Sequence, residues 1–116
     1  MDVKTFYEVI GESFEDVLSR LRKEDRIAKY VRMFVADGSF ADTVQGFESS
    51  DCEKAFRGAH TMKGTASNMG FTKLAKTASD LTEDLRPGAF TDKSRALLDA
   101  LKVEYDAVIA AAKNLD

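Results

Sequence analysis

Residues 51–70, DCEKAFRGAHTMKGTASNMG, contain the only histidine of the chain, His60, and read as a single helix. Gly70 marks the end of this helix, because glycine is the residue that most often terminates one. Gly64 lies one turn after His60, although a glycine inside a helix costs about 1 kcal/mol relative to alanine. A missing side chain beside an imidazole, kept despite this loss of helix stability, indicates that another group must reach the ring.

The positions around this helix separate an apolar face from the flank that carries the histidine. Each residue advances by about 100°, so with Ala59 at zero His60 lies at about 100°. Gly64 and Ser67 follow at about 140° and about 80°, which places them on the same strip as His60. Lys63 starts near the edge of the apolar face, and its long stem can carry the ammonium towards the imidazole. The apolar face comprises Cys52, Ala55, Phe56, Met62, Ala66 and Met69.

The rest of the chain also shows helical periodicity, with short connections and no segment that reads as a strand. The expected helices span about 3–10, 14–18, 24–36, 40–47, 52–69, 72–85 and 92–112. We therefore expect an all-α fold, an up-and-down antiparallel four-helix bundle with a short extra N-terminal helix. Residues 1–116 would form a single domain, with the bundle at about 24–116 and residues 1–23 as a helical lid.

Local sequence signals predict where helices begin and which segments are helical. Ser13 is expected to cap the second helix, Ser50 or Asp51 the histidine helix, and Thr72 the helix after it. In the helix that begins near Glu24, apolar residues recur at spacings of three and four. They are Ile27, Tyr30, Val31, Phe34 and Val35.

Composition limits the class of protein. The 116 residues are 44% hydrophobic and 32% charged, which is typical of one globular domain rather than a disordered chain. The lone Cys52 has no internal partner for a disulfide, which favours a reducing compartment. The first residues hold no apolar run long enough for a signal peptide or a membrane span. We therefore expect a cytoplasmic protein, monomeric and without a membrane contact.

The charge distribution singles out the neighbourhood of the histidine. The overall net charge is −3, but residues 54–76, called here the basic segment, hold five basic residues and no Asp or Glu. Such a segment attracts an anionic ligand or an acidic partner surface, although a solvated helix face without a role fits the charge equally well. The five are Lys54, Arg57, Lys63, Lys73 and Lys76.

Several histidine chemistries lack the residues they require. A metal site needs further ligands, yet no second histidine exists and no carboxylate lies three or four residues from His60. A hydrolytic triad needs a nucleophile and an acid beside the base, and Ser67 lies about 10 Å along the helix axis. Nucleic-acid binding would use the basic segment, which lacks a series of aromatic residues that could form a stacking platform. Met62 and Met69 fit core filling better than a peptide groove. A purely structural histidine remains open.

A phosphorylated histidine fits this strip of residues. Imidazole titrates near neutral pH and offers a ring nitrogen as a nucleophile. Lys63 can stabilise the added negative charge by a charge-assisted hydrogen bond, and Ser67 can offer a hydroxyl donor. Gly64 leaves room for the phosphoryl group and for the close approach of a partner's backbone.

The spacing of His60, Lys63, Gly64 and Gly70 resembles the signature of histidine-containing phosphotransfer (HPt) domains, His-x-x-Lys-Gly followed by Gly six residues later. With the flanking helical pattern, which includes Leu74, Ala78 and Leu81, the resemblance extends from about residue 24 onward. It implies a four-helix bundle that exposes a phosphorylatable histidine on the second bundle helix. Such domains carry a phosphoryl group on Nε2 between receiver-domain aspartates and have no catalytic activity of their own.

The resemblance also implies roles and partners. His60 would be the phosphocarrier, Lys63 the phosphate-supporting cation, Gly64 the steric gap and Gly70 a packing position. The expected partners are response-regulator receiver domains and a hybrid histidine kinase, with Mg²⁺ held by the receiver and no cofactor or metal on this chain.

Two further sets of residues are expected from this role. Phe56, Arg57 and Thr61 are candidates for the receiver-docking rim. Thr82 or Ser79 is the candidate for a polar donor on the facing helix. The alternative function is a helical adaptor that binds a receiver without phosphotransfer.

Overall fold

The computed structural model describes all residues 1–116 and contains seven α-helices and no strand. The expectation of an all-α chain is therefore confirmed. The helices are α1 (Val3–Ile10), α2 (Phe14–Leu21), α3 (Glu24–Ala36), α4 (Ser39–Glu48), α5 (Cys52–Asn68), α6 (Thr72–Leu85) and α7 (Ser94–Ala112).

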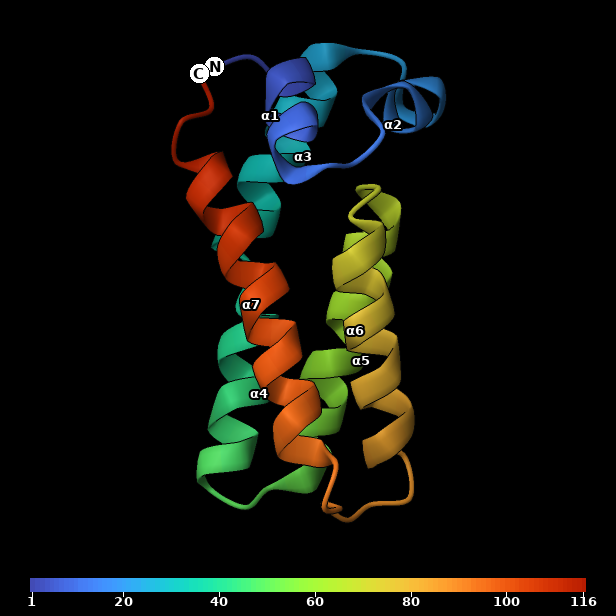
Figure 1. The fold of residues 1–116 in the computed structure, drawn as a ribbon, viewed down its shortest axis with the longest axis vertical. Helices are drawn as coiled ribbons and strands as arrows, with labels where there is room; N and C mark the ends of the chain where they lie inside the picture. The colour runs from blue at the N-terminus through green and yellow to red at the C-terminus, as the bar shows by residue number, and fades with distance from the viewer.

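Four helices, α4 to α7, lie side by side along the long axis of the molecule (Figure 1). The histidine helix α5 packs against both α4 and α6, and α6 packs against α7. Helix α3 continues upward from α4, while α1 and α2 lie at the upper end, where the two termini also meet (Figure 1). The molecule is elongated, with principal extents of 41, 23 and 19 Å.

An aromatic cluster joins the N-terminal helices to the rest of the molecule. Phe71, in the connection between α5 and α6, is fully buried. Its ring centroid lies 5.1 Å from that of Phe34, 5.8 Å from Tyr7 and 6.0 Å from Phe6. Aromatic pairs at such separations contribute about 0.5–1.5 kcal/mol each beyond their burial. Helix α1 is therefore anchored in the same core as α3 and the α5–α6 connection.

Two of the three expected caps are present. The Ser13 hydroxyl accepts a hydrogen bond from the Asp16 amide at 3.1 Å, and the Asp51 carboxylate accepts one from the Lys54 amide at 3.0 Å. The prediction that Thr72 caps α6 was wrong. Thr72 is the first helical residue, and its hydroxyl donates instead to a carboxylate from α1–α2, described below.

Two of the five periodic apolar residues of α3 lie outside its buried stripe. Ile27, Val31 and Phe34 are buried, but Tyr30 and Val35 are exposed, at 37% and 41% of their surface. A helix at the edge of the molecule buries only a narrow stripe, so residues at the margin of the apolar face remain in solvent.

Two glycines at the contact between α4 and α5 allow the two helices to lie close together. A Cβ added to Gly58 would overlap the Thr43 hydroxyl and lie 2.7 Å from the Ser39 carbonyl oxygen. A Cβ added to Gly46 would lie 2.5 Å from the Ala55 amide nitrogen. Thr43 is fully buried and donates its hydroxyl to Ser39 O at 2.8 Å. This close contact fixes the position of α5 and turns its opposite flank, which carries His60, outward.

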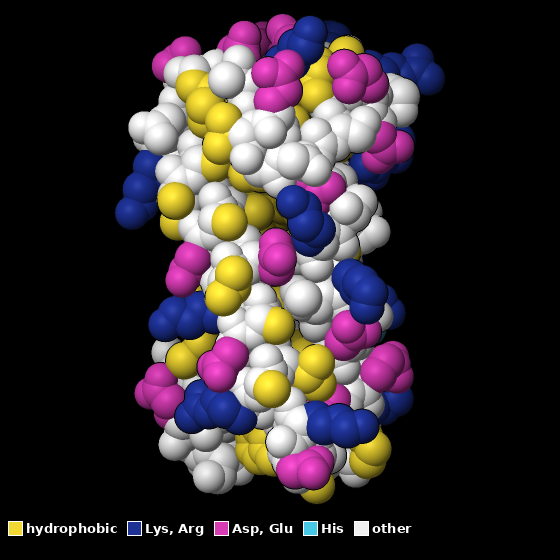
Figure 2. All heavy atoms as spheres, viewed as in Figure 1, with side chains coloured by type: hydrophobic (Ala, Val, Ile, Leu, Met, Phe, Trp, Pro, Cys, Tyr) yellow, Lys and Arg dark blue, Asp and Glu magenta, His cyan; other side chains and the backbone are white.

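The surface over α1, α6 and α7 carries no patch of one charge. Lys and Arg side chains alternate there with Asp and Glu, and hydrophobic side chains show between them (Figure 2). None of the seven helices combines the length and the apolar character that crossing a bilayer requires.

Candidate functional site

His60 lies near the middle of α5, on an exposed flank of the helix. Its neighbour Ala59 is fully buried, so the core begins one residue from the ring. Gly64 is exposed, and a Cβ placed there would meet no atom within 4 Å. The glycine one turn from the histidine is therefore not required by packing inside this chain.

A groove between α5 and α6 runs past the histidine. It encloses about 590 Å³ and brings together the four residues expected to serve the phosphoryl group, His60, Lys63, Gly64 and Ser67. The α6 side contributes Lys76, whose ammonium pairs with Asp80 at 3.1 Å and is largely exposed. An exposed nitrogen nucleophile beside two ammonium groups suits a ligand that carries negative charge. The remaining lining residues are Asn68, Thr72 and Ala75.

On its other side the histidine has an aromatic neighbour, and a guanidinium group lies over that aromatic ring. The Phe56 ring lies 6.0 Å from the His60 ring, centroid to centroid, with an angle of 17° between the planes. The guanidinium carbon of Arg86, from the end of α6, lies 5.3 Å from the Phe56 centroid. The sequence placed Phe56 near the site, but it held no signal for Arg86 because the contact crosses two helices.

Glu83 completes this flank. Its two carboxylate oxygens accept hydrogen bonds from Arg86 Nε and Nη2, both at 3.0 Å. These bonds from Arg86 lower the pKa of Glu83, and the positive charges of Lys63 and protonated His60 lower it further. An acidic residue from α6 therefore lies within electrostatic reach of the histidine, although the basic segment itself contains none.

The candidates on the facing helix have different outcomes. Thr82 is fully buried and donates its hydroxyl to Ala78 O at 2.7 Å, so the prediction that it supports the phosphate was wrong. Ser79 is partly buried and does not line the groove. Arg57 and Thr61, expected at the docking rim, are exposed on α5 beyond the groove.

The basic segment is more dispersed than its sequence indicates. Lys73 turns away from the histidine and donates its ammonium to Ile10 O at 3.0 Å. Lys54 donates to the side chain of Gln45 at 2.8 Å. Of the five cations, only Lys63 and Lys76 line the groove.

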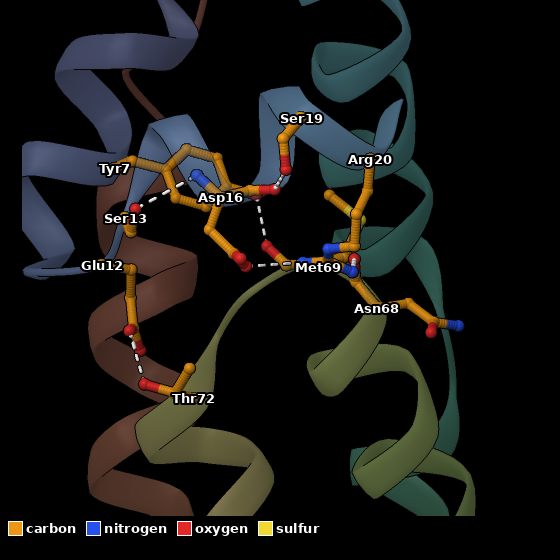
Figure 3. Close-up of polar contacts among 9 residues, drawn as sticks. All are labelled: Tyr7, Glu12, Ser13, Asp16, Ser19, Arg20, Asn68, Met69 and Thr72. Carbon is orange, nitrogen blue, oxygen red and sulfur yellow. Dashed lines mark hydrogen bonds and ion pairs between the residues drawn. The ribbon is translucent and has the colours of Figure 1, made fainter. Parts of the chain in front are cut away.

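The N-terminal helices hold the corner where α5 ends and α6 begins (Figure 3). Arg20 donates to Asn68 O at 2.9 Å, and the Tyr7 hydroxyl donates to Met69 O at 2.5 Å. The carboxylate of Glu12 accepts from the Thr72 hydroxyl at 2.6 Å and from the Lys73 amide at 3.1 Å. These contacts satisfy backbone groups that helix ends leave free. Residues 68 and 72, which close one end of the groove, are thereby fixed from outside the α5–α6 pair.

Other reactive groups are not arranged as a second centre. Burial raises the pKa of the Cys52 thiol, which lies 3.8 Å from Leu85 O and belongs to the apolar face of α5. No group of three or more His, Cys, Asp or Glu side chains is placed to hold a metal ion.

Comparison with known proteins identifies the family. Searches of curated proteins and of solved structures found no match. A family model described as the Hpt domain matches residues 12–111. The match starts before residue 24, where the resemblance seen in the sequence begins. It therefore also includes residues 12–23. The chain therefore belongs to the Hpt domain family, whose members are phosphocarriers with a role in phosphorelays.

Proposed function

We propose that this protein accepts a phosphoryl group on His60 from a receiver-domain aspartate and passes it to another receiver. The observation that carries the proposal is the open space at Gly64, beside an exposed histidine and next to Lys63. A glycine that no neighbour requires lowers helix stability without a packing reason. A phosphoryl group and the close approach of a partner supply the missing reason.

The transfer requires little from this chain beyond positioning. The lone pair of Nε2 attacks the phosphorus of the aspartyl phosphate, the N–P bond forms, and the P–O bond to the aspartate breaks. The carboxylate leaves with the electron pair, while Nδ1 keeps its proton. Lys63 and Ser67 then stabilise the phosphoryl oxygens by hydrogen bonds, the first of them charge-assisted. The receiver supplies Mg²⁺ and the acidic pocket, so this chain needs no cofactor or metal and has no turnover of its own.

The architecture fits this role. We infer that α4, α5, α6 and α7 form the up-and-down bundle of the family, with α5 as the second bundle helix and α1–α2 at one end. Phe56, which stacks against the His60 ring, and the exposed residues Arg57 and Thr61 form the rim of the receiver-docking surface. The partners are receiver domains and a hybrid histidine kinase, and we expect a monomer that acts in the cytoplasm.

The direct test is transfer from a phosphorylated receiver. The wild-type protein should take up an acid-labile, base-stable phosphate, and His60→Gln should take up none. Lys102→Gln is a control, because it changes an exposed side chain of α7 outside the groove and should leave the labelling unchanged. Label on the His60→Gln protein would contradict the proposal. A wild-type protein that binds the receiver but never becomes labelled would favour the adaptor function instead.

A further inference from the structure

The structure places a carboxylate of α6, that of Glu83, within electrostatic reach of His60 on α5. Helices α5 and α6 run antiparallel, since the Asn68–Thr72 connection joins them at one end and Cys52 contacts Leu85 near the other. This register places the last turns of α6 beside the first half of α5, where the Arg86 guanidinium lies over the Phe56 ring. Glu83 binds Arg86, Arg86 lies over Phe56, and Phe56 stacks against His60, so these contacts connect Glu83 to the histidine.

Glu83 already binds the cation that lies over the Phe56 ring. Both of its oxygens bind the Arg86 guanidinium, which lies over the Phe56 ring, and that ring stacks against the imidazole. The charge of Arg86 is thus compensated before any phosphoryl group arrives. A phosphoryl group on His60 would be a second anion near the same cations.

We propose that the negative charge of Glu83 raises the phosphoryl-transfer potential of phosphorylated His60, so that the group passes on to a receiver more readily. This inference rests on the proposed function of His60. Glu83 acts on the phosphoryl group through its negative charge and does not contact the reacting atoms, so it is a positioning residue and not a catalytic one. The charge of Glu83 shifts the equilibrium of phosphoryl transfer from His60 towards the receiver aspartate.

The physical cause is repulsion between like charges together with competition for Arg86 and Lys63. The carboxylate of Glu83 is exposed, so solvent and salt screen the repulsion strongly. A charge pair in such a setting changes an equilibrium constant by about two- to fivefold. The effect should shrink at high salt, whereas a change in packing would not.

The experiment measures the transfer equilibrium. A receiver domain phosphorylated with radiolabelled acetyl phosphate and freed of excess donor is mixed with each variant, and label on aspartate and histidine is counted at equilibrium. Glu83→Gln should shift label towards His60 by about two- to fivefold at low salt and by less at 1 M salt. Glu83→Asp, which keeps the charge, should behave as wild type. Glu24→Gln removes the same charge from the start of α3, away from the groove, and should also leave the equilibrium unchanged.

The outcomes separate this inference from the function on which it rests. If wild-type protein is labelled on His60 but Glu83→Gln matches it, or retains less label, the inference is overturned and the phosphocarrier function stands. A shift in Glu83→Asp equal to that in Glu83→Gln also overturns it, because the charge is then not the cause. If the wild type takes no label, the proposed function itself fails. Thermal unfolding of each variant confirms that the folded fractions are equal.

Discussion

Two glycines six residues apart on α5 face opposite environments. Gly58 is buried against α4, where any side chain would overlap Thr43 and crowd the Ser39 carbonyl. Gly64 is exposed, and a side chain there would meet no neighbouring atom. Both lower the intrinsic stability of the helix by about 1 kcal/mol relative to alanine. Gly58 recovers that loss through packing within this chain, whereas Gly64 does not, which is the signature of a position kept for a partner or a ligand.

The strongest test of this distinction uses Gly70, which should resemble Gly58 although it lies outside the helix. Its φ is +74°, in the left-handed region, and an added Cβ would overlap the Val17 side chain. Gly70→Ala should therefore lower the free energy of unfolding by about 2–4 kcal/mol, from backbone strain and overpacking together. Denaturant unfolding measures the change. A loss below about 0.5 kcal/mol would contradict the likeness of Gly70 to Gly58, because α2 would then move away from the added methyl group at little cost.

Gly58→Ala should have the next largest effect. The added methyl group forces α4 and α5 apart, which costs about 1–3 kcal/mol in a close-packed contact. The decrease should appear in thermal unfolding while phosphorylation of the folded fraction stays normal. If the variant instead unfolds like wild type but transfers slowly, the two glycines do not differ as we describe.

The hydrogen-bonded corner where α5 ends and α6 begins should lose stability at alkaline pH. Burial raises the pKa of the Tyr7 phenol above its ordinary value of about 10. The phenol must stay protonated in the folded state, so its contribution is complete below about pH 10 and is lost as the pH rises further. At pH 7 the free energy of unfolding of Tyr7→Phe should be about 1–2 kcal/mol lower than that of the wild type, because Met69 O loses its hydrogen-bond donor.

The comparison that checks this is stability against pH from 7 to above 10 for the wild type and Tyr7→Phe. The difference between the two proteins should narrow at the alkaline end. The pKa of Tyr105 is also raised by burial, so the variant should keep part of the alkaline sensitivity. A constant difference across this range would contradict the role of the Tyr7 proton.

Gly64→Ala should have the smallest effect on folding and the opposite sign. Alanine gains up to about 1 kcal/mol in a helix and meets no obstacle here. Transfer from a phosphorylated receiver should nevertheless slow, because the methyl group narrows the approach to the imidazole. Gly38→Ala is the matched control, since its Cβ also meets no atom within 4 Å and it lies outside the groove. A Gly64→Ala protein that is more stable and equally fast would remove the functional reason for this glycine.

The comparison also shows what a single sequence can predict. The helices and most of their boundaries follow from apolar spacing and from caps such as Ser13 and Asp51, because these signals act within a few residues. The strip of His60, Lys63, Gly64 and Ser67 was predictable for the same reason, since one helix determines how its own side chains align.

The residues that escaped prediction all depend on the register between helices. The spacing along α6 does not say which of its residues lies beside His60. It therefore favours Thr82 or Ser79, although Thr82 is buried, and gives no signal for Arg86 or Glu83. The cap on α6 was missed because its acceptor, Glu12, lies 60 residues away along the chain.

The hydrogen bond from the Lys73 amide to Glu12 makes this amide a reporter of separation between α1–α2 and the start of α6. The amide of Lys73 would be a free donor at the start of α6 if Glu12 were not bound to it. Its hydrogen exchange with solvent therefore proceeds only when α1–α2 separates from the α5–α6 corner or the whole chain unfolds. The exchange rate of this single amide, followed by NMR before and after a receiver binds, would report whether the partner loosens or tightens the far end of the molecule.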